Sequence, residues 1–160
     1  MSTMKRSTVL SALAAAVLAG PAVAQAAVVA RVTHSDAEWR KLLAPEAYEV
    51  LRHEGTERAF SSPLDEEKRP GTYFCAGCDL ALYSSKTKFD SGTGWPSFWQ
   101  PLPNAVSTHH DTSLFMERTA VTCARCDGHL GHVFDDGPKP TGLRYCMNGV
   151  ALRFRPGRAA

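Results

Sequence analysis

Two widely separated Cys-x-x-C pairs constrain the fold of this chain more than any other feature. The first pair is Cys75 and Cys78, and the second is Cys123 and Cys126. Two residues between thiolates make a tight turn that presents both sulfurs to one metal ion, and two such turns complete a tetrahedral zinc site. Because the pairs lie further apart than in a compact zinc ribbon, the fold itself must bring the two turns together.

Disulfide bonds are the competing interpretation of these four cysteines, since an exported protein can keep them oxidised. A disulfide within a Cys-x-x-C pair is a strained redox bond, however, and two of them in one small domain would be unusual. We therefore expect one zinc ion per chain and no organic cofactor. The metal is expected to be structural, because four thiolates leave no open coordination position for chemistry.

Cys146 is the fifth cysteine and stays unpaired in either interpretation. If residues 144–148 are extended, alternation places Arg144, Cys146 and Asn148 on one face. A nearby positive charge favours the thiolate, which is the nucleophilic form. A lone cysteine in an apolar strand is more often a small buried hydrophobic residue, but an unpaired thiol in an exported protein favours a catalytic role.

The first 26 residues have the layout of a secretory signal peptide. Lys5 and Arg6 precede an apolar run from Val9 to Ala19, and small residues suited to cleavage follow. The run is too short for a dedicated membrane span, and the alternative is an uncleaved anchor. We expect an exported protein, periplasmic or secreted, that uses the general secretory or the twin-arginine route.

Removal of this segment also removes the basic excess of the chain. The formal net charge of +2 equals the charge of Lys5 and Arg6, and no acidic residue accompanies them. The mature protein is therefore balanced in charge, and neither nucleic acid nor a membrane surface is an expected partner.

Two short helices are predicted near the start of the mature chain. Ser35 and Glu38 have the form of a capping box, which predicts a helix from Asp36 to about Leu43. A second helix is predicted to begin at Pro45 and to stop at Gly55. The residues expected to face inward are Trp39, Leu42, Leu43, Tyr48, Val50 and Leu51.

From Gly71 onward, runs rich in aromatic and β-branched residues alternate with turn residues, as is typical of short strands. The expected strands are Gly71–Cys75, Leu80–Ser84, Val106–His110, Leu114–Val121, His129–Phe134 and Leu143–Phe154. No helix interrupts them, so we predict one mainly β, mostly antiparallel domain at residues 35–156. Residues 27–34 are expected to form a flexible lead-in.

Three motifs in a characteristic order give the chain a family resemblance. They are Lys88–Phe98, Gly128–Gly137 and Arg144–Asn148. Through them the chain resembles the B-type methionine sulfoxide reductases, which reduce the R epimer of methionine sulfoxide in proteins, and the resemblance extends from about Ser35 to Arg155. Both Cys-x-x-C pairs fall where zinc-binding members carry theirs. The resemblance implies two antiparallel sheets packed as a zinc-clamped sandwich, with the metal remote from the active face.

The resemblance also implies roles for individual residues. Cys146 matches the nucleophilic cysteine, and Trp95 matches the tryptophan that packs against the substrate methyl group. Asn148 matches one of the polar residues that receive the sulfoxide oxygen. Phe98 is expected in the core or at the rim of the substrate pocket. Arg144 is expected either to lower the pKa of Cys146 or to form a surface salt bridge.

His129 and His132 match the other polar residues that receive the oxygen. Because histidine titrates near neutral pH, we expect His132 to protonate the leaving oxygen or to hold a water, with His129 assisting. Their offset of three residues would place them on opposite faces of an ideal strand, whereas a bulge or turn at Gly131 would bring both to the site. The alternative is a pair of surface histidines or zinc ligands.

The expected reaction begins when the Cys146 thiolate attacks the sulfoxide sulfur. Methionine then departs, and Cys146 is left as a sulfenic acid that a thiol must reduce. The expected substrates are oxidised proteins, and the enzyme is expected to be a monomer.

Three positions depart from the family pattern. Many members carry a resolving cysteine where this chain has Thr93. Cys146 then has no evident partner within the chain, and we expect an external thioredoxin-like or small-molecule thiol to complete the cycle. The family often has Ile and Ser where this chain has Met147 and Gly149, which is expected to alter only local packing.

Two other functions fit parts of the sequence. A non-catalytic binding module on the same zinc-clamped β scaffold would use an aromatic pocket around Trp95, but it needs neither the thiol nor the two histidines. A thiol–disulfide oxidoreductase would work through the Cys-x-x-C pairs. A metal assay separates these cases, because about one tightly held zinc ion per chain leaves those cysteines unavailable.

Overall fold

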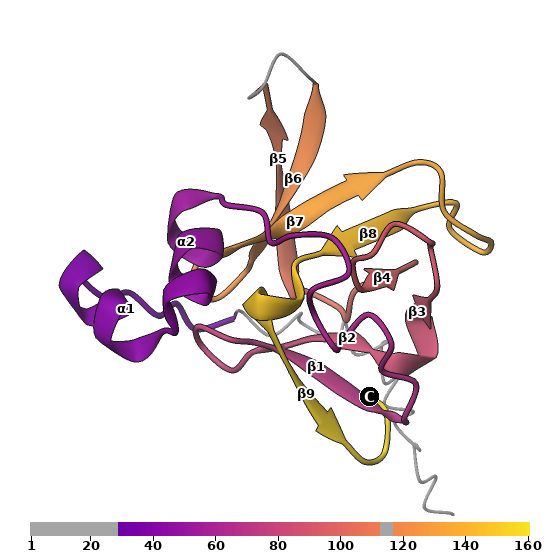
Figure 1. Cartoon of the computed structure of the whole chain (residues 1–160), viewed down its shortest axis with the longest axis horizontal. Coiled ribbons are helices and arrows are strands. Elements are labelled where there is room, and N and C mark those ends of the chain that lie inside the picture. Colours follow the sequence, from indigo (N-terminus) through magenta and orange to yellow (C-terminus); the bar gives the residue numbers. More distant parts are fainter. Residues whose placement is uncertain (1–28, 113–116) are drawn as a thin grey trace, which may run out of the picture.

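The computed structural model describes residues 29–112 and 117–160. The expected signal peptide at residues 1–26 therefore lies outside the described residues. Within them, nine strands form two antiparallel sheets, and two short helices pack beside these sheets (Figure 1). The predicted mainly β fold with two antiparallel sheets is confirmed. No helix in the described ranges is long and apolar enough to cross a bilayer.

The smaller sheet has three strands in the order β2-β1-β9, and the larger has six in the order β3-β4-β8-β7-β6-β5. The strands are β1 (Gly71–Cys75), β2 (Ala81–Ser84), β3 (Lys88–Phe89), β4 (Ser97–Phe98), β5 (Val106–Asp111), β6 (Arg118–Cys123), β7 (His129–Phe134), β8 (Arg144–Met147) and β9 (Leu152–Pro156). The bounds of β1 and β7 agree with the prediction. The two-residue strands β3 and β4 were not predicted, because two residues carry no readable alternation.

Helix α1 (Asp36–Leu42) begins at the predicted capping box. The backbone N–H of Ser35 donates to Glu38 Oε2 (2.7 Å), and the N–H of Glu38 donates to Ser35 Oγ (3.3 Å). Such reciprocal bonds satisfy donors that an isolated helix start leaves free. Trp39 is buried as expected, whereas Leu42 is 54% exposed and the prediction that it faces inward is wrong.

Helix α2 (Pro45–His53) packs its buried face against β7 and against a 3-10 turn at Gly149–Ala151. The predicted inward residues are all buried: Tyr48, Val50 and Leu51. Glu54, with a φ of 57°, takes the left-handed position that ends this helix. The helix therefore stops one residue before the predicted Gly55.

The predicted single strand Leu143–Phe154 is wrong, because the chain changes sheets within it. β8 ends at Met147, the 3-10 turn follows, and β9 pairs with β1 in the other sheet. The buried carboxylate of Glu57 holds this turn by accepting the N–H groups of Gly149 (2.7 Å) and Val150 (2.9 Å). These donors have no partners along a strand, so the carboxylate replaces the missing ladder bonds.

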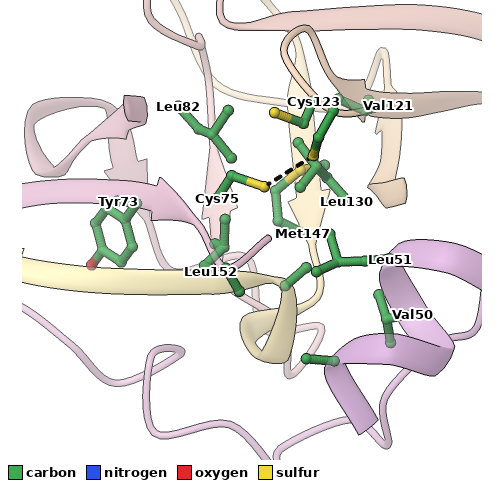
Figure 2. Packing of buried hydrophobic residues seen from close by; sticks show 14 of the residues in the cluster. Val50, Leu51, Tyr73, Cys75, Leu82, Val121, Cys123, Leu130, Met147 and Leu152 are labelled. Atoms are coloured by element: carbon green, nitrogen blue, oxygen red, sulfur yellow. Dashed lines mark hydrogen bonds between the residues drawn. The ribbon is translucent and has the colours of Figure 1, made fainter. Parts of the chain in front are cut away.

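One core joins the two sheets. Phe98 of the larger sheet stacks on Tyr83 (ring centroids 4.3 Å apart) and meets Tyr73 edge-on (4.9 Å), both from the smaller sheet. Phe98 is 0% exposed and therefore belongs to the core, not to a pocket rim. Figure 2 shows part of this core, in which Leu82, Leu130 and Met147 belong to the same buried cluster as Cys75 and Cys123.

The predicted irregularity near Gly131 is present as a shift of register between β6 and β7. Val121 lies opposite Gly131, but Thr122 lies opposite His129, so β7 carries one extra residue at Leu130. Gly131 also lies against β8, where a Cβ atom would be only 2.1 Å from the carbonyl oxygen of Cys146. A side chain larger than hydrogen therefore cannot be placed here without separating the two strands.

We predict that Gly131→Ala destabilises the fold by about 3 kcal/mol, the upper part of the usual range for overpacking, because backbone atoms must move. Urea unfolding followed by tryptophan fluorescence measures this loss. Gly142→Ala is the matched control: its φ is +73° but no atom lies within 4 Å of the new Cβ, so it should cost only about 1–2 kcal/mol of backbone strain. Equal losses in the two variants would contradict the proposed close approach of β7 and β8.

Candidate functional site

Cys146 lies in β8, between β4 and β7. Ser97 of β4 and His132 of β7 are its direct neighbours in the register. Residues directly opposite each other on antiparallel strands share a face of the sheet, so these three side chains project to the same side. The cysteine is half-buried, while Ser97 beside it is completely buried.

A small open pocket of about 130 Å³ lies over this face. Its lining residues are Thr56, Trp95, Arg118, Gly131, His132, Phe134, Cys146 and Asn148. The fold thus brings together four of the residues expected to form the site. They are Cys146, Trp95, His132 and Asn148. Arg144 and His129 are not among the lining residues, and Phe98 lies in the core.

The two histidines lie on the same side of the sheet, with ring centroids 5.2 Å apart. His129 is 3% exposed, and neither of its ring nitrogens has a hydrogen-bond partner among the described residues. Burial, together with the charge of neighbouring His132, lowers the pKa of His129 to about 4. His129 is therefore neutral at pH 7.

His132 is held by an acidic partner that the sequence analysis did not identify. Its Nε2 lies 2.8 Å from Asp111 Oδ2 on the β5–β6 hairpin, and Arg118 Nη2 donates to the same oxygen (2.8 Å). Burial lowers the pKa of His132, although the hydrogen bond to Asp111 acts in the opposite direction. The pattern His-x-x-His contains no signal for this partner, because Asp111 belongs to another hairpin.

The amide of Asn148 is oriented by two backbone segments. Its Nδ2 donates to Leu130 O (3.1 Å), and its Oδ1 accepts the N–H of Glu57 (2.9 Å). Trp95 Nε1 donates to the carbonyl oxygen of the same Glu57 (3.2 Å). Glu57 therefore positions two pocket residues through its backbone, and no local sequence pattern predicts this.

Cys146 is a thiol with a raised pKa in the free site. Burial raises the pKa of Cys146, and contacts with Thr93 and Arg144 offset only part of that effect. Thr93 Oγ1 lies 3.8 Å from the cysteine sulfur. The guanidinium of Arg144 forms two 2.8 Å bonds to Asp136 and lies over the ring of Phe134 (4.3 Å to its centroid). Arg144 is thus a salt-bridge partner that also favours the thiolate, but burial has the larger effect.

Hydroxyl groups fill the space beside the thiol, at the position where the family resemblance would place a resolving cysteine. Ser91 Oγ lies 2.8 Å from Thr93 Oγ1 and 2.7 Å from Ser97 Oγ. The three hydroxyls form a connected chain that ends at Cys146. None of them can form a disulfide bond.

The other two departures from the family pattern have local structural explanations. Met147 is fully buried, and its sulfur accepts a hydrogen bond from Tyr83 (3.1 Å). At Gly149, a Cβ atom would lie only 1.9 Å from the hydroxyl oxygen of Ser62. The Ser62 side chain therefore takes the space that a residue larger than glycine would need.

The loop that carries Trp95 has an unusual neighbour. Phe60 is 72% exposed and has a φ of 61°, a conformation that bulky residues rarely adopt. Its backbone N–H donates to the carbonyl oxygen of Gly94 (2.7 Å), so it supports the residue directly before Trp95.

The four remaining cysteines meet in one cluster whose sulfurs all lie within 4.8 Å of one another. Cys75 and Cys126 have their sulfurs 3.7 Å apart, and Cys78 and Cys123 have theirs 3.5 Å apart. A tetrahedral zinc ion with Zn–S bonds of about 2.3 Å separates its sulfurs by about 3.8 Å. The cluster can therefore hold a metal ion, and its donors and spacing fit zinc.

This cluster connects the two sheets. The first Cys-x-x-C turn begins at the end of β1 in the smaller sheet, and the second begins at the end of β6 in the larger one. Val32, in the expected lead-in, donates its N–H to Arg125 O (2.8 Å) inside the second turn. None of the four sulfurs lines the pocket at Cys146.

Comparisons with known proteins agree with this geometry. A family model described as the SelR domain matches residues 43–156. Peptide methionine sulfoxide reductase MsrB of Pseudomonas putida strain W619 is 60% identical over 120 residues, which are 74% of this chain and 90% of the relative. MsrB of Agrobacterium fabrum strain C58 is 54% identical over 127 residues, 79% of this chain and 94% of the relative. Peptide methionine sulfoxide reductase B1, chloroplastic, of Arabidopsis thaliana is 57% identical over 121 residues, which are 75% of this chain and 60% of the relative.

We predict that iodoacetamide modifies Cys146 slowly at pH 7 and faster as the pH rises, with a midpoint above that of cysteine in a short unstructured peptide with blocked ends, because burial raises the pKa of Cys146. Arg144→Ala should move the midpoint higher still, since it removes a cation that favours the thiolate. Quenched alkylation and mass analysis of the Cys146 peptide give the pH profile.

Arg69→Ala is the matched control, because Arg69 also pairs with a carboxylate and lies over a phenylalanine ring, but beside β9. It should leave the profile of Cys146 unchanged. A midpoint at or below that of cysteine in the blocked unstructured peptide would contradict the described burial of the thiol.

Proposed function

The chain belongs to the SelR domain family, and on that premise we propose that it is a peptide-methionine (R)-S-oxide reductase acting on oxidised proteins. One observation carries the proposal: the thiol outside the four-sulfur cluster, Cys146, shares a small pocket with Trp95, His132 and Asn148. A nucleophile, an apolar wall, a proton carrier and an amide are the groups that sulfoxide reduction requires.

Cys146 is the proposed nucleophile and attacks the sulfoxide sulfur. The substrate oxygen is transferred to the cysteine sulfur, so that the sulfoxide is reduced by two electrons to a thioether and the thiol is oxidised to a sulfenic acid. The thiol proton ends on the transferred oxygen, which balances the reaction. No other proton or electron is needed in this half of the cycle.

His132 is the proposed proton carrier. Because burial lowers its pKa, His132 is neutral before the reaction and can accept the proton of the Cys146 thiol before passing it to the oxygen. The carboxylate of Asp111 stabilises the imidazolium that forms in between. His129, which is neutral, buried and in ring contact with His132, is proposed to assist by keeping that ring in place.

Trp95 and Asn148 are proposed to orient the substrate. The indole is fixed by its bond to Glu57, so it offers an apolar wall to the methyl group of the sulfoxide. Asn148 uses one N–H of its amide to bond Leu130 and keeps a second for the sulfoxide oxygen. An apolar wall on one side and donors on the other distinguish the two epimers.

An external thiol is the proposed reductant of the sulfenic acid. Thr93 occupies the position beside Cys146 and cannot form a disulfide, and the other four cysteines belong to the metal cluster. A thioredoxin-like protein or a small-molecule thiol would form a mixed disulfide with Cys146 and release water, and a second thiol would then restore the free cysteine.

We also propose that the cluster binds one zinc ion per chain, held by Cys75, Cys78, Cys123 and Cys126. When bound, the ion serves as a structural cross-link between the two sheets, because four thiolates complete its coordination. Export with cleavage near residue 26, a periplasmic or secreted location, and a monomeric state remain proposals from the sequence.

We predict that Cys146→Ser abolishes turnover of methionine-R-sulfoxide, by a factor of about 10³ or more, because a hydroxyl is a far weaker nucleophile and cannot become a sulfenic acid. The loss is measured with a chiral assay of an N-acetylated substrate and dithiothreitol as reductant. Metal content and thermal midpoint should remain those of the unchanged protein. Retained activity would refute the assignment of Cys146.

Metal analysis should find about one zinc ion per chain, and we predict that Cys75→Ser lowers the thermal midpoint by about 10 °C or more, since losing a structural metal costs several kcal/mol. Cys146→Ser serves as the control, because it removes a cysteine outside the cluster. A Cys75→Ser variant that is fully stable and active without zinc would rule out a structural metal.

A further inference from the structure

The catalytic pocket has room for little more than the oxidised side chain itself. Its volume is about 130 Å³, and its lining comes from residues that surround the thiol. The residues before and after the methionine of a polypeptide substrate must therefore lie on the surface around the pocket. A polypeptide substrate thus requires a second binding surface that a free amino acid does not.

A larger groove, of about 800 Å³, begins at the edge of this pocket. Its lining residues come from α2, from residues 55–64 and from the 3-10 turn that follows β8. Thr56 lines both the pocket and the groove, and Gly149 in the groove directly follows Asn148 in the pocket. Because the pocket and the groove share Thr56, an extended peptide with its methionine in the pocket can continue into the groove, and four of its residues span about 13 Å.

The α2 wall of the groove is acidic. Glu46 and Glu49 both line the groove, are exposed, and lie three residues apart on the same side of the helix. Among the described residues, neither carboxylate takes part in a salt bridge. Glu57 also lines the groove, but its carboxylate is bound to backbone N–H groups. Arg58 belongs to the wall formed by residues 55–64, so the acidic character is confined to the α2 wall.

We propose that this groove binds the substrate polypeptide on one side of the oxidised methionine and favours a lysine or arginine within four residues of it. The proposal rests on the reductase function proposed above and adds a sequence preference to it. Its basis is the continuity of groove and pocket, together with two exposed carboxylates that have no cationic partner within the described chain. A cationic side chain of the substrate supplies that partner.

Two isomeric peptides test the proposal with the full chain. Each is acetylated and amidated, contains a central methionine-R-sulfoxide, and carries two lysines either before or after it, with serine elsewhere. Because the peptides have the same composition and net charge, nonspecific electrostatic attraction to the enzyme is the same for both. We expect one isomer to have a kcat/KM about fivefold higher than the other, as surface ion pairs allow, mainly through a lower KM.

The double variant Glu46→Gln and Glu49→Gln should reduce this preference to less than about twofold. Glu66→Gln is the control, because Glu66 is an exposed glutamate that lines a different depression, and it should retain the full preference. Equal kcat/KM for the two isomers would overturn the groove proposal, as would a preference that survives in the double variant.

A substrate without flanking residues separates this proposal from the reductase function. N-acetylmethionine-R-sulfoxide methylamide enters the pocket but does not reach the groove. Turnover of this substrate together with equal use of the two peptides overturns the groove alone. No turnover of any of the three substrates overturns the reductase function itself.

Discussion

The buried carboxylate of Glu57 holds the part of the fold on which the site depends. Its two bonds to the N–H groups of Gly149 (2.7 Å) and Val150 (2.9 Å) end β8 and direct the chain into the other sheet. A buried carboxylate is costly unless its hydrogen bonds are satisfied, so the turn and the carboxylate require each other. Burial accordingly raises the pKa of Glu57, and the two N–H groups offset part of this effect. Through its backbone the same residue orients Asn148 and Trp95.

The five cysteines divide into two chemical classes because of where the strands end. One Cys-x-x-C turn begins at the end of β1 in the smaller sheet and the other at the end of β6 in the larger, and the four sulfurs meet in one cluster. Cys146 instead lies within a strand, where its neighbours are a hydroxyl chain on one side and His132 on the other. Burial raises the pKa of this thiol and lowers the pKa of the histidine. The proton therefore stays on sulfur until a substrate arrives, which limits unspecific reaction of the free enzyme.

The sequence predicted best those features whose cause is local. The capping box at Ser35, the strand His129–Phe134 and the metal-binding spacing of the cysteines each involve residues a few positions apart. The irregularity near Gly131 could also be anticipated, because two histidines three residues apart cannot share a face of a regular strand.

The features that the sequence did not predict depend on contacts between distant segments. Glu57 and Gly149 are 92 residues apart in sequence, and no local pattern shows that this glutamate ends β8. Asp111 reaches His132 from a different hairpin. The raised pKa of Cys146 likewise follows from burial, whereas the neighbouring Arg144 alone suggested a lowered pKa.

The central claim is that Cys146 alone takes the oxygen while the other four sulfurs remain bound to a metal. Native mass spectrometry of the full chain tests it most directly, after one equivalent of methionine-R-sulfoxide and without any thiol reductant. The account predicts a gain of one oxygen, about 16 Da, located on Cys146, with the mass of one zinc ion retained. A loss of two hydrogens, which indicates a disulfide, together with release of the metal would contradict it.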